Sequence, residues 1–345
     1  MRALITGGAG FVGSHIAEYY AKKDWDITVF DNLSRSKLLN SETKNADFNA
    51  KFLQKNFPKI KLVQKDIVDF EELDAAAKGA DVIFHAAAQT AVTASVKDPV
   101  ADFKTNAIGS FNVMEAARKN DVKTVVYCST NKVFGNNTDS IEVTEGEKRY
   151  NFGKGFEKGL PETFSIDLCE HTPYGTSKLT GDLYAQDYSH VYGIKTGVFR
   201  MSCIYGTRQF GVEDQGWVSW FSIATILGKP ITIYGDGKQV RDVLYVSDLI
   251  ELYDKFINSN VKHGVYNTGG GKENTMSLLE LLEILKKLTG KESSLSFSDW
   301  RPSDQKVFIA DISKAGHELG WAPKIKPEEG VQKLVDWAKE NKDIF

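Results

Sequence analysis

The feature that most constrains the fold is a glycine-rich stretch near the N-terminus, TGGAGFVG at residues 6–13. It follows a short apolar run and precedes an amphipathic helical pattern. Gly7 permits a tight turn, Gly10 lets backbone N–H groups approach a ligand, and Gly13 lets the helix pack closely on the strand. The stretch therefore predicts a strand–turn–helix unit that opens a parallel sheet.

Short apolar runs continue to alternate with helical patterns through the first half of the chain. Helices are predicted at 12–23, 70–78 and 105–120, between strands at 3–6, 27–30, 61–64, 82–85 and 125–128. This alternation predicts βαβ units with right-handed crossovers. The expected fold is therefore α/β, with a doubly wound parallel sheet of the Rossmann type.

The alternation stops after about residue 205, which predicts a second, smaller α/β lobe that would bind the substrate. We assign residues 1–203 and about 240–260 to the doubly wound domain, and about 204–239 and 261–345 to the second lobe. The polar stretch at 142–161 is predicted to be a solvated loop or, alternatively, a lid.

Composition excludes several classes of protein. The 43 basic and 46 acidic residues give a net charge of −3, so no overall charge favours nucleic acid. Hydrophobic residues make up 41% of the 345, as in an ordinary globular protein. Neither a membrane helix nor a secretory signal is predicted. The three cysteines are far apart and form no metal pattern, which together with the missing signal favours the cytoplasm.

An acidic residue beyond the glycine loop indicates a dinucleotide cofactor. Asp31 ends the second strand, where its carboxylate can accept both ribose hydroxyls and repel a 2′-phosphate, favouring NAD. Arg35 leaves NADP open. Asp66 and Ile67 follow the third strand and are expected beside the adenine, with helix capping by Asp66 as the alternative. The small side chains of residues 86–88 would let the cofactor lie across the strand ends.

One tyrosine–lysine pair has the context of a catalytic base. A lysine one helical turn after a tyrosine lowers the phenol pKa, because its positive charge stabilises the phenolate. Tyr174 and Lys178 follow a Thr-Pro helix start after the fifth strand, at the edge where ligands bind in open α/β sheets. Thr130, at the end of that strand, can bridge the phenol and a ligand hydroxyl; Ser129 is the alternative. The same spacing also occurs at Tyr19/Lys23, Tyr150/Lys154 and Tyr234/Lys238.

Together these segments resemble the extended short-chain dehydrogenase/reductases that act on nucleotide sugars. The shared motifs are TGGAGFVGSH, DNLSR, HAAA, STNKVFG, PYGTSK, GDGKQVRDVLYVSD and RPSDQK. Within that family, STNKVFG, the long insertion before TPYG, IYGTRQFGVEDQGWVSWF and SDQKVF are similar to the 2-epimerases of CDP-hexoses. Asn131 and Lys132 stand where the 4,6-dehydratases of the family carry an acidic pair, so elimination of water is not expected.

The resemblance implies an isomerase that retains NAD and oxidises a sugar transiently before reducing it from the opposite face. Tyr174 would be the base, Lys178 its helper, and Thr130 would align the hydroxyl. The expected cofactor-binding residues are Gly7, Gly10, Phe11, Val12, Gly13, Asp31, Asn32, Ser34, Arg35, Asp66, Ile67, Ala86, Ala87, Ala88, Asn106, Tyr174 and Lys178. The expected substrate-binding residues are Thr130, Asn131, Lys132, Ser202, Arg208, Gln209, Gln215, Arg241, Arg301 and Asp304, and no metal site is expected.

Other functions remain open from the sequence. A UDP-hexose 4-epimerase would use the same base and cofactor, and a net oxidoreductase or a non-catalytic NAD-binding protein could share the fold. Phe134 and Ser202 depart from the tyrosine and asparagine that are usual in relatives. The resemblance also implies a homodimer through the helices at about 101–119 and 176–192, where Phe111, Met114, Leu179 and Leu183 would offer apolar contacts.

Overall fold

The computed structural model describes residues 1–34, 45, 47–301 and 304–345. Its main element is a seven-stranded sheet in which every adjacent pair of strands is parallel. In spatial order the strands are β12 (His263–Thr268), β8 (Lys195–Met201), β5 (Thr124–Thr130), β4 (Val82–His85), β1 (Arg2–Thr6), β2 (Asp26–Phe30) and β3 (Lys61–Val63). The doubly wound parallel sheet predicted from the sequence is confirmed.

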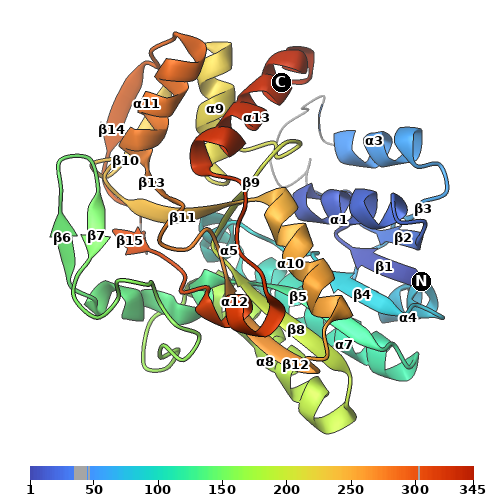
Figure 1. Ribbon diagram of the computed structural model, residues 1–345. Helices are drawn as coiled ribbons and strands as arrows, with labels where there is room; N and C mark the ends of the chain where they lie inside the picture. Colours follow the sequence, from blue (N-terminus) through green and yellow to red (C-terminus); the bar gives the residue numbers. More distant parts are fainter. Residues whose placement is uncertain (35–44, 46, 302–303) are drawn as a thin grey trace.

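Helices cover both faces of this sheet (Figure 1). One face packs against α1 (Phe11–Ala21), α3 (Phe48–Asn56), α10 (Val246–Asn258) and α12 (Ser313–Leu319). The other packs against α4 (Phe70–Ala77), α7 (Gly109–Lys119) and α8 (Thr172–Tyr192). Strands buried on both faces read as continuous apolar runs, as in β5, where all seven residues are buried.

The second lobe packs three helices around short strands. Its helices are α9 (Trp217–Leu227), α11 (Leu278–Thr289) and α13 (Pro327–Glu340). A four-stranded sheet contains β9 (Cys203–Tyr205), β11 (Val240–Tyr245), β13 (Thr275–Ser277) and β15 (Val307–Phe308), and a second pair contains β10 (Ile231–Tyr234) and β14 (Leu295–Ser298). A 3-10 turn, η3 (Lys342–Ile344), follows α13.

One strand departs from the expected domain boundary. We assigned residues 261–345 to the second lobe, but β12 pairs with β8 over six residues at the edge of the large sheet. The polar residues at its ends, His263, Asn267 and Thr268, hid this pairing from the sequence pattern. None of the helices in the described part of the chain combines the length and apolar character needed to cross a membrane.

The insertion at residues 142–161, before α8, contains a hairpin anchored to the second lobe. After η2 (Asn131–Ser140), strands β6 (Val143–Glu145) and β7 (Tyr150–Phe152) pair antiparallel. Tyr150 is buried and its hydroxyl donates to Asp236 at 2.5 Å, while Arg149 pairs with Glu280 at 3.3 Å. These contacts place the segment along the second lobe rather than as a solvated loop.

Candidate active site

The glycine loop has the shape that a dinucleotide requires. Gly7 adopts a left-handed φ of +68°, and a Cβ on Gly13 would lie 2.1 Å from the Gly7 carbonyl oxygen. A Cβ on Gly10 would meet only that carbonyl, at 3.1 Å, so its other side is open. Phe11 and Val12 begin α1, whose N-terminus can face a pyrophosphate. The loop therefore fits NAD.

Asp31 lies at the end of β2 beside this loop. Its carboxylate accepts the Ala9 N–H at 2.9 Å and the Leu33 N–H at 2.8 Å, and burial raises its pKa. These bonds hold the carboxylate at the loop while leaving lone pairs for ribose hydroxyls. The neighbouring Ser34 N–H donates to Asn32. Arg35 lies outside the described residues.

The residues expected around the adenine follow the ends of β3 and β4. Asn32 donates to Asp66 at 2.8 Å. Asp69, rather than Asp66, caps α4, so the capping alternative for Asp66 is wrong. Ile67 is buried against α7. Ala86–Ala88 follow β4, and a Cβ on Gly7 would lie only 2.6–2.7 Å from backbone atoms of Ala86 and Ala87.

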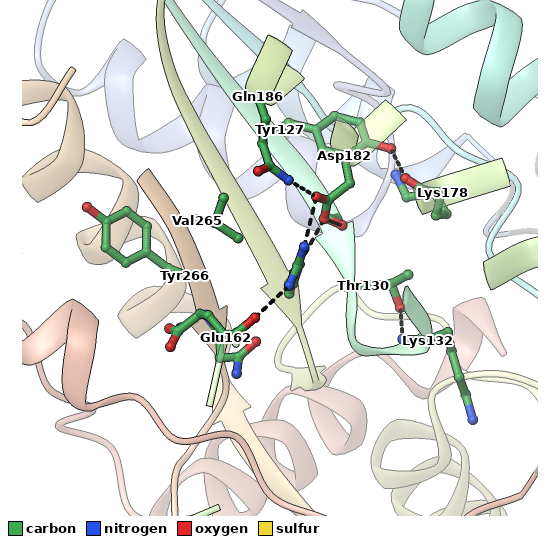
Figure 2. Close-up of polar contacts among 12 residues, drawn as sticks. Tyr127, Thr130, Lys132, Glu162, Lys178, Asp182, Gln186, Val265 and Tyr266 are labelled. Atoms are coloured by element: carbon green, nitrogen blue, oxygen red, sulfur yellow. Dashed lines mark hydrogen bonds and ion pairs between the residues drawn. The ribbon is translucent and has the colours of Figure 1, made fainter. Parts of the chain in front are cut away.

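Tyr174 and Thr130 meet where β5 ends and α8 begins. The Tyr174 side chain is buried, and the Thr130 hydroxyl lies close enough to lower its pKa. Ser129, the alternative hydroxyl, donates instead to Asp182 at 2.6 Å. Asp182, which Figure 2 labels, also pairs with Arg200 in a buried ion pair that joins α8 to β8. Thr130 is therefore the hydroxyl that faces the phenol.

Burial dominates the electrostatics of the pair. It raises the pKa of Tyr174 to about 12, although the nearby Thr130 hydroxyl opposes this shift. It lowers the pKa of Lys178 to about 8. The Lys178 ammonium donates to the Cys128 carbonyl oxygen at 2.7 Å and lies 4.3 Å from the centre of the Tyr127 ring. Lys178 is thus held one turn below Tyr174 by strand β5.

A buried polar network lies behind α8, and Asp102, Ser177 and Gln89 in it were missed in the sequence. Asn106 donates to Asp102 at 3.1 Å and to Ser177 at 3.2 Å, and Ser177 donates to Asp102 at 2.5 Å. Gln89 exchanges two hydrogen bonds with Asn106. Asn106 lies in a π-helical turn, η1 (Lys104–Ile108), between α6 (Pro99–Phe103) and α7. The resemblance implies that Asn106 supports a helix kink near the site, besides its place among the expected cofactor-binding residues, and here it lies in the π-helical turn and bonds within the protein beside α8.

Short helix α5 (Val92–Lys97) contributes one more support. Its Ser95 accepts the backbone N–H of Tyr174 at 3.2 Å, which satisfies a donor at the start of α8. No spacing rule links residues so distant in sequence.

A cavity of about 160 Å³ in the second lobe gathers several predicted substrate residues. Its wall includes Gln215, Arg241, Arg301 and Asp304. Arg241 pairs with Asp304 at 2.6 Å, and Arg301 pairs with Asp214 at 3.0 Å. Two guanidinium groups in one cavity suit a diphosphate.

Other predicted residues lie elsewhere. Arg208 is buried against α1, where it pairs with Glu18 at 2.7 Å, and it does not line the cavity of the second lobe. The Gln209 amide donates to the Ile204 carbonyl oxygen, and the Ser202 hydroxyl donates to buried Asp242. Asn131 and Lys132 follow Thr130 directly, at the start of η2.

The aromatic side chains divide between cavity and core. Trp217 lines the cavity and packs on the second-lobe core, whereas Trp220 packs on that core alone. Phe134 is fully buried and stacks on Phe308, with 6.3 Å between ring centres. The phenylalanine that replaces a tyrosine therefore belongs to the core beneath the insertion.

The comparisons with known proteins agree with this geometry. Residues 3–269 match the "NAD dependent epimerase/dehydratase family". The chain is 39% identical to "CDP-paratose 2-epimerase" of Salmonella typhi, over 98% of this chain and 99% of that protein. It is 32% identical to "Putative UDP-glucose 4-epimerase" of Methanocaldococcus jannaschii, over 98% of each.

Solved structures show the same fold with ligands. UDP-glucose 4-epimerase of Thermotoga maritima, solved with UDP-glucose, is 29% identical, covers 99% of this chain and 100% of its own, and gives a TM-score of 0.81. UDP-glucuronic acid 4-epimerase of Bacillus cereus, in complex with UDP-glucuronic acid and NAD, is 26% identical with a TM-score of 0.82, over 99% and 100% of the chains. Sequence, fold and site together make this chain a member of the NAD-dependent epimerase/dehydratase family of nucleotide-sugar enzymes.

Proposed function

We propose that this protein interconverts the two configurations at carbon 2 of a CDP-hexose, through transient oxidation to a keto-sugar. The observation that carries the proposal is that buried Tyr174, at the start of α8, lies beside Thr130, at the end of β5 on the sheet edge. Tyr174 is thus the candidate base, and residues 131 and 132 beside it carry no carboxylate. The segment 213–217 lines the cavity of the second lobe. The CDP-paratose 2-epimerase relative supports the choice of nucleotide and carbon.

The protein's part in the reaction is proton transfer and positioning. Tyr174 would take the proton of the sugar hydroxyl and later return it, while Thr130 orients that hydroxyl. Bound NAD would supply the hydride acceptor and a positive charge near the phenol. Because burial raises the pKa of Tyr174 to about 12, positive charge beside the phenol favours its ionised form at neutral pH. Lys178, held by the Cys128 carbonyl, would contact the nicotinamide ribose.

The nucleotide would occupy the cavity of the second lobe. Arg241 and Arg301 would bind the diphosphate by forked hydrogen bonds, and Asp304 and Gln215 would contact the ribose and sugar. A UDP-hexose 4-epimerase is the second candidate, because the relative of Methanocaldococcus jannaschii carries that description. A non-catalytic NAD-binding protein is disfavoured, since Tyr174, Lys178 and Thr130 are all present.

Deuterium labelling tests both the carbon and the route. The enzyme, assayed with CDP-paratose or CDP-tyvelose deuterated at carbon 2, should invert that carbon and retain the deuterium, because the hydride leaves and returns without meeting water. Turnover in heavy water should add no deuterium there. The product is analysed by NMR and mass spectrometry. Inversion at carbon 4 of a UDP-hexose alone would reject the CDP-hexose assignment, and solvent deuterium at carbon 2 would reject the redox route.

A further inference from the structure

The backbone of Lys132 contacts Thr130 and the start of α8. Its backbone N–H donates to the Thr130 hydroxyl at 3.3 Å. Its carbonyl oxygen packs against Gly175, the residue after Tyr174, where an added Cβ would lie only 2.8 Å from it. In Figure 2 the Lys132 side chain extends from the Thr130 end of β5, away from Lys178. The two lysines therefore serve different parts of the site.

The charge of Lys132 acts toward the arginine end of the site. Burial and the positive charge of Arg241 lower its pKa, the carboxylates of Asp304 and Asp139 oppose them, and the net result is a pKa of about 8. Arg241 and Asp304 line the cavity of the second lobe. Lys132 itself lines a small hollow of about 10 Å³ that Thr172 and Gln305 also border. Its backbone therefore lies beside Thr130 and the start of α8, and its charge interacts with the Arg241 and Asp304 side chains of the expected diphosphate site.

The chemistry of a nucleotide sugar matches this position. Its diphosphate has one phosphate on the nucleoside side and one bonded to the anomeric carbon of the sugar. Arg241 and Arg301 can hold the first, and the compact ammonium of Lys132, whose backbone contacts Thr130 and Gly175, suits the second. We propose that Lys132 binds the sugar-linked phosphate and so presents carbon 2, rather than carbon 4, to Tyr174. Carbon 2 neighbours the anomeric carbon, whereas carbon 4 lies across the ring. The role of Lys132 in selecting carbon 2 over carbon 4 rests on the proposed function.

Binding of CDP and CMP isolates the phosphate contact from the reaction. The terminal phosphate of CDP corresponds to the sugar-linked phosphate, and CMP lacks it. We expect Lys132→Met to weaken CDP binding about ten- to hundredfold, as for loss of a charge-assisted hydrogen bond, and to leave CMP binding unchanged. Lys132→Arg should keep most of the difference in affinity between CDP and CMP. Lys229→Met, on the surface at the end of α9, is the control and should behave as wild type.

One result of this binding experiment would reject the inference. If isothermal titration shows that Lys132→Met weakens the binding of CDP and CMP equally, or of neither, then Lys132 does not bind the sugar-linked phosphate. Retained CMP binding also shows that the variant's pocket is folded. A loss confined to CDP in an enzyme that inverts carbon 4 would keep the phosphate contact but reject its role in choosing the carbon. The failure of the proposed function is therefore distinguishable from that of this inference.

Discussion

At the scale of single residues, the Tyr174 hydroxyl is the group on which the proposed chemistry depends. Tyr174→Phe keeps the buried ring but removes the proton acceptor, so we expect kcat to fall roughly 10²–10⁴-fold while CDP affinity and the melting temperature stay near wild type. Tyr150→Phe is the matched control, because that hydroxyl is also buried in a hydrogen bond, yet with Asp236 in the second lobe. Near-normal turnover by Tyr174→Phe would mean that the base lies elsewhere.

At the scale of elements, α8 is held in place by the network around the π-helical turn η1. Asn106→Ala would leave the buried backbone N–H and carbonyl of Gln89 unpaired and remove one of the hydrogen bonds to Asp102, so we expect a loss of about 1–3 kcal/mol in the free energy of unfolding and a fall in kcat as Tyr174 shifts. Asn112 of α7 bonds the Ile67 carbonyl oxygen at 3.0 Å. Asn112→Ala should lower stability in urea without lowering kcat. Equal effects of both variants on kcat would assign the network a merely structural role.

At the scale of the whole molecule, exposed apolar side chains gather on helices of one face of the sheet. They are Val96, Val100, Phe103, Phe111, Leu183, Tyr184, Val191 and Tyr192. Met114 and Leu179, expected among them, instead pack in the interior. We propose that this surface joins two copies of the chain, since patches of this kind mark interfaces. Phe111→Glu with Leu183→Glu should give a monomer by light scattering, whereas Phe297→Glu, exposed on β14, should not. A wild-type monomer at micromolar concentration would reject the dimer.

The sequence by itself determined the features that depend on neighbours along the chain. The glycine spacing encodes the turn between β1 and α1, and the Thr-Pro start with Tyr174 and Lys178 encodes one face of α8. Alternating apolar runs determined the parallel sheet, because each strand needs both faces covered. These signals are local, so they could be recognised without knowing what packs against them.

Only the tertiary structure decided which distant side chains meet. Arg208 pairs with Glu18, 190 positions before it, although its motif suggested the sugar cavity. The Ser129 hydroxyl donates to Asp182, so Thr130 is the hydroxyl that faces Tyr174. Strand β12 joins the large sheet by pairing with β8. The physical reason is that a buried polar group must find a partner wherever the fold brings one, and that choice follows packing rather than sequence spacing.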